Sequence, residues 1–275
     1  MELIDFDGLF DEKLAVYMEE NQDKYTEKQW EDVIPRLYQK FGDTYVAKVK
    51  CTPKEYYAKM TEEQLSAVLE KHLEEEVPVP EFLCAEIESR GNVAVLLPLL
   101  TSGDSQKAEY AVNLIGDNKS VFPTYVALLK EGALDEDVLD DIVDLLKCHA
   151  DEVKVEAISM YEEDCGKEYA LEILSKTSAG DEKVYQILMD EFLRYGEKTA
   201  MRASYLSSYG DVRALDALLA RIDDESIGFV EFQELKYAIE ALGGEYTKPR
   251  DFTGDKDYLA VEAAFPSPKK KENLS

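Results

Sequence analysis

A polar turn recurs at nearly constant intervals from residue 91 onward. It reads Gly91-Asn92, Gly116-Asp117, Ala150-Asp151, Gly180-Asp181 and Gly210-Asp211. Glycine ends a helix in a left-handed conformation, and Asn or Asp then caps the next helix by accepting from its free backbone amides. Between the turns, apolar residues repeat at helical spacing. The turns therefore predict a chain of short helices.

These helices are expected in pairs, because each repeat contains two apolar stretches separated by a second, shorter break. The predicted pairs are 92–101 with 104–115, 119–130 with 134–148, 151–163 with 166–176, 181–193 with 197–209, and 212–222 with 228–243. The first helices start 27, 32, 30 and 31 residues apart. One pair cannot bury its apolar face alone, so stacked neighbours must supply a continuous core. We expect an all-α solenoid of about five helix pairs over residues 91–245.

One repeat resembles a known family. Residues 209–219, Tyr-Gly-Asp-Val-Arg-Ala-Leu-Asp-Ala-Leu-Leu, resemble the signature turn of the short HEAT-like repeats also found in phycobilisome lyases. Residues 238–244 resemble the end of the second helix of such a unit, whereas the turns at Gly116 and Gly180 lack the arginine. With residues 35–38 and 52–57, the whole chain also resembles a group of uncharacterised acidic HEAT-like proteins of bacteria. The resemblance implies a HEAT-like α-solenoid, and it leaves a lyase-type enzyme open as an alternative function.

The regions on either side of the repeats have different patterns. Residues 1–90 are predicted to be a helical N-terminal extension, with capping threonines at Thr26, Thr52 and Thr61. Pro35 interrupts the helical pattern after Thr26, which predicts a kink or two shorter helices. Residues 246–275 are predicted to be a largely irregular C-terminal tail, with one turn of helix from Tyr258 onward.

The charge of the chain limits its partners. It has 59 acidic residues against 31 Lys and Arg, a formal net charge of -28. Such a charge repels phosphate backbones and anionic bilayers, so we expect neither nucleic acid nor membrane as a partner. A protein with a basic surface, a cationic ligand or a metal ion is favoured. The alternative is that the acidity only keeps the chain soluble.

Several features predict a cytoplasmic location. The N-terminal residues are acidic where a signal peptide is basic, and no long apolar segment follows. The longest apolar run, residues 93–100, is far too short to span a membrane. The cysteines have neither metal-ligand spacing nor disulfide density, and we expect them reduced and mostly buried: Cys51, Cys84, Cys148 and Cys165.

We predict no catalytic residues and no cofactor, which favours a protein that is not an enzyme. The chain has only two histidines, and His149 follows Cys148 directly, so the two side chains point in different directions on a helix. No phosphate-binding glycine motif is present. The oligomeric state is left open.

Residues 223–234 resemble an EF-hand calcium loop in their first, sixth and twelfth positions. Glu225 stands third and Ile227 fifth, where Ile227 offers no oxygen ligand. Residues 5–12 look similar, but Gly8 is out of register. We interpret the first segment as a turn with Phe229 and Val230 already in the next helix, and the second as a capped helix start. No metal site is predicted, and a calcium-regulated binding protein is the third candidate function.

The candidate partner-binding residues lie on the helix predicted at 134–148. Its apolar face is expected to comprise Val138, Leu139, Ile142, Leu145 and Leu146, and four aspartates occupy the opposite face: Asp137, Asp140, Asp141 and Asp144. Such a stripe suits Lys or Arg groups of a partner, although it is also typical of a solvated face. On the helix at 197–209, Tyr205 and Tyr209 are expected in the core, on the same face as Lys198 and Arg202. The leading hypothesis is a protein-binding scaffold or adaptor.

Overall fold

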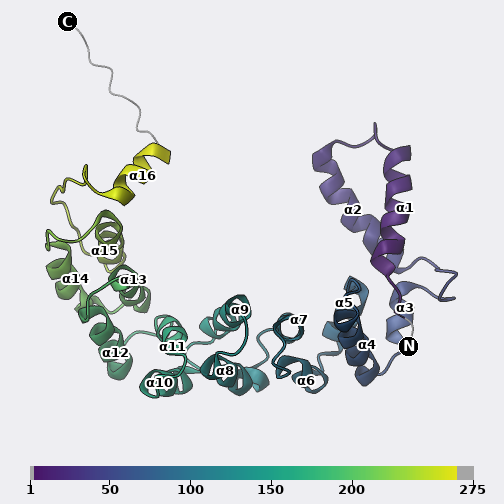
Figure 1. Cartoon of the computed structure of the whole chain (residues 1–275), viewed down its shortest axis with the longest axis horizontal. Helices are drawn as coiled ribbons and strands as arrows, with labels where there is room; N and C mark the ends of the chain where they lie inside the picture. Colours follow the sequence, from purple (N-terminus) through teal and green to yellow (C-terminus); the bar gives the residue numbers. More distant parts are fainter. Residues whose placement is uncertain (1–2, 265–275) are drawn as a thin grey trace, which may run out of the picture. The chain divides into compact units, whose positions relative to one another are not determined.

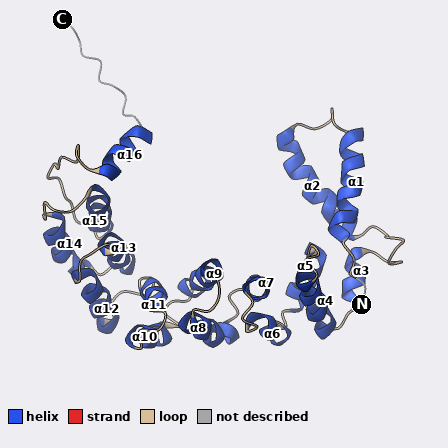
Figure 2. Ribbon diagram, viewed as in Figure 1, coloured by secondary structure: helices blue, strands red, loops and turns tan. Residues whose placement is uncertain are grey.

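The computed structural model describes residues 3–264, which form helices and loops without a β-sheet (Figures 1 and 2). Within that range, extended pairing is limited to an isolated bridge between Val46 and Cys51. The chain divides into two compact units. The first comprises residues 1–128 and 132–142, and the second comprises residues 129–131 and 143–275. The boundaries predicted after residues 90 and 245, which separate the N-terminal extension, the repeats and the tail, rest on the sequence repeat and not on these units. They stay a prediction.

The chain begins with two antiparallel helices, α1 (Phe6–Glu20) and α2 (Glu27–Gly42). Thr26 caps α2 as predicted, in a reciprocal capping box with Gln29. Pro35 lies inside α2, which is one helix, so the prediction of two shorter helices is wrong. Ring contacts of α2 with α1 on both sides of Pro35 hold the helix together: Tyr17 with Trp30, and Phe10 with Tyr38. Pro35 itself is exposed, where its ring meets solvent.

Three further helices complete the base of this hairpin: α3 (Pro53–Ala58), α4 (Glu62–Glu74) and α5 (Glu81–Arg90). The predicted capping boxes of Thr52 and Thr61 are both present. Helix α3 and helix α4 each pack against α5. Tyr38 of α2 stacks on Phe82 of α5, with ring centroids 4.6 Å apart. The hairpin is therefore anchored at one end by aromatic contacts.

Each of the ten helical segments predicted from residue 92 onward contains a helix. In chain order these are α6 (Leu97–Leu100), α7 (Ser105–Ile115), α8 (Phe122–Glu131), α9 (Glu136–Lys147), α10 (Lys154–Glu162), α11 (Lys167–Leu174), α12 (Glu182–Leu193), α13 (Thr199–Tyr209), α14 (Leu215–Ile222) and α15 (Phe229–Ala241). Short 3₁₀ turns precede three of them: η1 (Val93–Val95), η2 (Lys119–Val121) and η3 (Val212–Ala214). Helix α6 packs against α7, α10 against α11, α12 against α13, and α14 against α15.

The predicted capping at the turns is confirmed for Asn92, Asp181 and Asp211, whose side chains accept backbone amides of the following helix. At residues 116–118 the capping residue is Asn118 instead of Asp117. Asp151 does not cap α10, so that prediction is wrong. Its carboxylate accepts instead from the backbone amide and hydroxyl of Ser178, at 2.9 and 2.5 Å. The Asp151 carboxylate is therefore bound by a residue 27 positions later in the chain and not by the amides at the start of α10.

Tyr209 fixes the end of α13 against a neighbouring turn, in agreement with its predicted core position. Its buried hydroxyl donates to the carbonyl of Asp181 and accepts from the amides of Gly180 and Asp181. Tyr205 is only half-buried. Residues 246–255 are irregular, and α16 (Lys256–Ala264) is longer than the single turn predicted there. The rest of the predicted tail lies outside the described residues.

Candidate functional site

Helix α9 carries the acidic residues that the sequence singles out. Its buried side chains are Val138, Leu139, Ile142, Val143 and Leu146, while Leu145, predicted for the apolar face, is half-buried. The predicted partner-binding residues are all exposed: Asp137, Asp140, Asp141 and Asp144. The first three belong to the first unit and Asp144 to the second. Burial of the apolar residues fixes the rotation of α9 and leaves the carboxylates in solvent.

One of these carboxylates already has a cationic neighbour. Lys147 Nζ lies 2.5 Å from Asp144 and 2.6 Å from Glu172. Asp140 also interacts within the chain.

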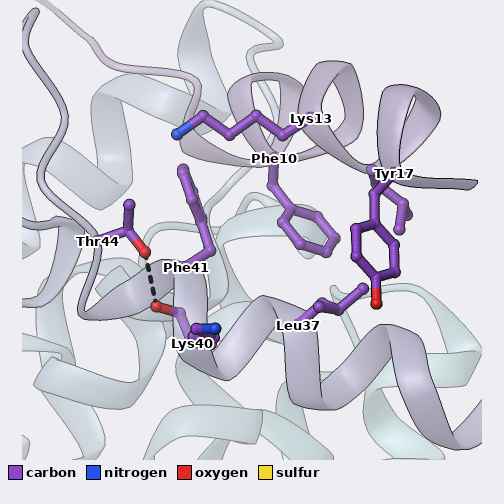
Figure 3. Close-up of a pocket in the computed structure, with 8 residues that line it drawn as sticks. Phe10, Lys13, Tyr17, Leu37, Lys40, Phe41 and Thr44 are labelled. Carbon is purple, nitrogen blue, oxygen red and sulfur yellow. Dashed lines mark hydrogen bonds between the residues drawn. The ribbon is translucent and has the colours of Figure 1, made fainter. Parts of the chain in front are cut away.

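A groove between α1 and α2 is a second candidate, which sequence reasoning missed (Figure 3). Its volume is about 160 Å³. Four lining residues come from α1, Phe10, Lys13, Leu14 and Tyr17, and the others are Leu37, Lys40, Phe41 and Thr44. The Thr44 hydroxyl donates to the carbonyl of Lys40 at 2.9 Å and so ties the turn after α2 to the groove. The walls are mainly apolar, and the charged groups among the lining residues are two lysines.

A third candidate is an ionic cluster in the second unit, centred on Glu191 of α12. Glu191 is only 7% exposed and lies 2.9 Å from Lys167 and 3.1 Å from Arg194. The Tyr161 hydroxyl donates to the same carboxylate at 2.8 Å. Burial raises the pKa of Glu191, but the hydrogen bonds from Lys167 and Tyr161 outweigh burial and leave that pKa below its ordinary value. Burial and Glu191 together raise the pKa of Tyr161 to about 12.

Arg202 of α13 joins this cluster in an unusual position for an arginine. It is 5% exposed, and its Nη2 donates to both oxygens of Glu168 at 2.7 Å. Lys198, on the same helix face, lies 3.1 Å from Glu168. Because Glu168 and Glu191 are already held by cations, the cluster is best explained as a stabilising network. The sequence places Arg202 on the tyrosine face but gives no signal of its burial.

Two buried polar groups in the first unit lack such partners. His72 is 0% exposed, and its Nε2 has no hydrogen-bond partner within the described residues. Its Nδ1 lies 3.4 Å from the carbonyl of Val77. The buried Tyr57 hydroxyl is also unpartnered within the described range. Burial lowers the pKa of His72 and raises that of Tyr57.

The cysteines differ from the prediction that most are buried. All four are free thiols, but Cys148 and Cys165 are exposed and Cys84 is half-buried, so only Cys51 fits the prediction. Cys148 and Cys165 lie in the loops that follow α9 and α10, where the core does not cover them. The Nδ1 atom of His149 lies 3.1 Å from the Glu152 carboxylate.

The two segments that resemble calcium loops have structural roles. The carboxylate of Asp223 is paired with Lys248, and that of Asp224 with Arg221. Helix α15 begins at Phe229, which confirms that Phe229 and Val230 are helical. Asp5 caps α1 by accepting from the Gly8 amide at 2.7 Å, which confirms the capped helix start. Among residues 3–264, no three metal-ligating side chains converge.

No family model, curated protein or solved structure matches this chain. Within the described part of the chain, no helix has the length and apolar character needed to cross a membrane.

Proposed function

We propose that this chain is a protein-binding scaffold, a HEAT-like α-solenoid whose acidic surface receives a partner protein with a basic surface. The observation that carries the proposal is α9, where four aspartates are exposed opposite a buried apolar face. Complementary charge on a partner increases its association rate and selects it against other acidic proteins. Like charges three and four residues apart cost a helix a few tenths of a kcal/mol per pair, and a basic partner offsets that cost.

The solenoid part of the proposal is supported by the regular placement of the helices. Four of the predicted helix pairs pack as neighbours, α6 with α7, α10 with α11, α12 with α13 and α14 with α15, and α13 also contacts α15. Stacked helix pairs of this kind present long surfaces that suit protein partners.

A matched pair of charge-neutralised variants tests the α9 surface. The first replaces Asp137, Asp140, Asp141 and Asp144 with Asn, and the control replaces four exposed acids elsewhere with their amides: Glu109, Glu156, Asp190 and Asp216. Both remove the same charge. Binding of a labelled Lys- and Arg-rich peptide is measured by fluorescence anisotropy at about 0.15 M salt, where charges beyond about 8 Å are screened.

We expect the α9 variant to lose several times more affinity than the control, because the peptide contacts the stripe directly. Equal losses would mean that the peptide senses only net charge, and the stripe would then be a solvated face.

A further inference from the structure

The α1–α2 hairpin is an amphipathic surface that the rest of its unit covers only at one end. Phe6, Phe10 and Phe41 are buried near the base. Beyond them, the apolar side chains of both helices are at most half-buried: Leu14, Val16, Tyr17, Met18, Trp30, Val33, Ile34 and Leu37. Apolar surface gathered in this way on a small hairpin marks an interaction site.

The size of the groove restricts what enters it. Its volume of about 160 Å³ lies below the roughly 300–1,000 Å³ of small-molecule sites. A cavity of about 150 Å³ with Leu, Ile and Phe walls holds one benzene molecule. The groove therefore takes one large apolar side chain, with Phe10 and Leu37 as opposing walls (Figure 3).

The charge of the groove has the opposite sign to the chain. Lys13 and Lys40 are its charged lining groups, in a protein of net charge -28. The Lys13 ammonium lies over the Phe41 ring, 4.9 Å from its centroid. Within the described residues, neither ammonium is paired with a carboxylate. Two cations without a carboxylate partner in the described range therefore lie beside an apolar groove. They complement a ligand that has one apolar side chain for the groove and carboxylates on either side of it.

We propose that the α1–α2 groove binds an acidic amphipathic helix of a partner protein, which inserts one Leu or Phe side chain between Phe10 and Leu37. Its flanking Glu or Asp residues pair with Lys13 and Lys40. This is the helix-in-groove mode of recognition, in which anchors one turn apart enter a groove. The two lysines favour a partner with negative charge, and the apolar contacts of the groove provide most of the affinity.

A second copy of this chain is the competing occupant. Two chains of net charge -28 repel one another, and the same long-range repulsion acts on any acidic partner. At physiological salt the Debye length is about 8 Å, so the lysines within contact distance outweigh distant acids. A short acidic helix carries far less charge than a second whole chain, which makes it the favoured occupant.

The only tryptophan of the chain, Trp30, reports on this surface. Its ring lies 6.2 Å from that of Tyr17, a groove residue. The full-length protein is titrated with a synthetic 18-residue helix carrying Leu and Phe on one face and Glu elsewhere, and with a matched peptide that carries Lys in place of Glu. Trp30 emission and the anisotropy of labelled peptide are followed at about 0.15 M salt.

We expect the Glu peptide to shift Trp30 emission at a lower concentration than the Lys peptide does. The double variant Lys13→Glu, Lys40→Glu weakens the Glu peptide by roughly tenfold and strengthens the Lys peptide. The control double variant, Lys28→Glu with Lys59→Glu, makes the same charge change at exposed sites outside the groove and leaves the preference unchanged. Circular dichroism verifies that both variants are folded.

Three results would overturn the proposal. One is that neither peptide changes Trp30 emission, and another is that the Lys peptide changes it at a lower concentration than the Glu peptide does. The third is a parent that is dimeric by light scattering and becomes monomeric on Leu37→Asp, which would assign the groove to a second copy. Trp30 emission reports on the hairpin, whereas the aspartate substitutions test α9, so this proposal and the α9 proposal can fail separately.

Discussion

Two pairs of amphipathic helices in this chain are covered to very different extents. In α12 and α13 the apolar face is closed, with Val184, Leu188, Phe192 and Leu206 at 1% exposure or less. In α1 and α2 the face is closed only near Phe6, Phe10 and Phe41. The sequence patterns of the two pairs are similar, so the difference arises from their neighbours.

The number of packing partners accounts for the contrast. Helix α13 packs against α12 on one side and α15 on another. Helix α1 has α2 as its principal helical neighbour, and α2 has α1 and α3. A helix surrounded on several sides buries its whole apolar stripe, whereas a two-helix hairpin leaves half of each stripe in water. Closed surfaces provide stability, and the open one is available for binding.

Matched leucine truncations should give the largest difference between the two regions. Leu206→Ala, in α13, removes a fully buried side chain and should cost about 2–5 kcal/mol of unfolding free energy. Leu37→Ala, in α2, removes a half-buried one and should cost about 1 kcal/mol. Urea unfolding is followed by circular dichroism for the whole chain and by Trp30 fluorescence for the hairpin. Similar costs would show that the hairpin is as closely packed as α12 and α13.

The second prediction concerns the charged groups of the closed region. Glu191→Gln removes one partner from a buried network and leaves Lys167 uncompensated, which should cost about 2–4 kcal/mol. Glu162→Gln makes the same change in an exposed pair with Lys183 and should have little effect. The two unfolding midpoints in urea are compared. A neutral Glu191→Gln would mean that water replaces the network at no cost.

The third and smallest effect is a pH dependence in the first unit. Burial holds the pKa of His72 below its usual value, while hydrogen bonds with the backbone at Val77 and Pro78, and then the charges of Asp5 and Asp7, act in the opposite direction. The unfolded chain therefore binds a proton before the folded one, and stability falls as pH drops below about 6.5. One proton limits the slope to about 1.4 kcal/mol per pH unit.

Thermal unfolding of His72→Leu between pH 7.5 and 5 tests this prediction. The variant should lose part of the decline that the parent shows, and His149→Leu, which changes the other histidine, is the matched control. Glu168 and Glu191 have lowered pKa values, so their contribution is lost only below about pH 4.5, outside this window. An identical decline in parent and His72→Leu would assign the pH response to other groups.

The sequence by itself determined where the helices lie, because its signals are local. Thr26, Thr52 and Thr61 contact amides three residues away, and Asp181 and Asp211 cap within their own turns. The amphipathic period of α9 placed its four aspartates in solvent for the same reason. Whether those aspartates bind a partner is not a local property, and it stays a proposal.

Tertiary structure decided which faces are covered and which charges are buried. Arg202 is buried because Glu168 lies beside it, 34 residues earlier in the chain. Asp151 accepts a hydrogen bond from Ser178 and does not cap α10. Helix α2 continues through Pro35 because α1 contacts it on both sides of the proline. Among the described residues, the groove between α1 and α2 is lined by these two helices and by Thr44 after α2, and no residue of a third helix covers it. A periodic sequence specifies an apolar stripe, but only the surrounding helices determine whether that stripe becomes core or binding surface.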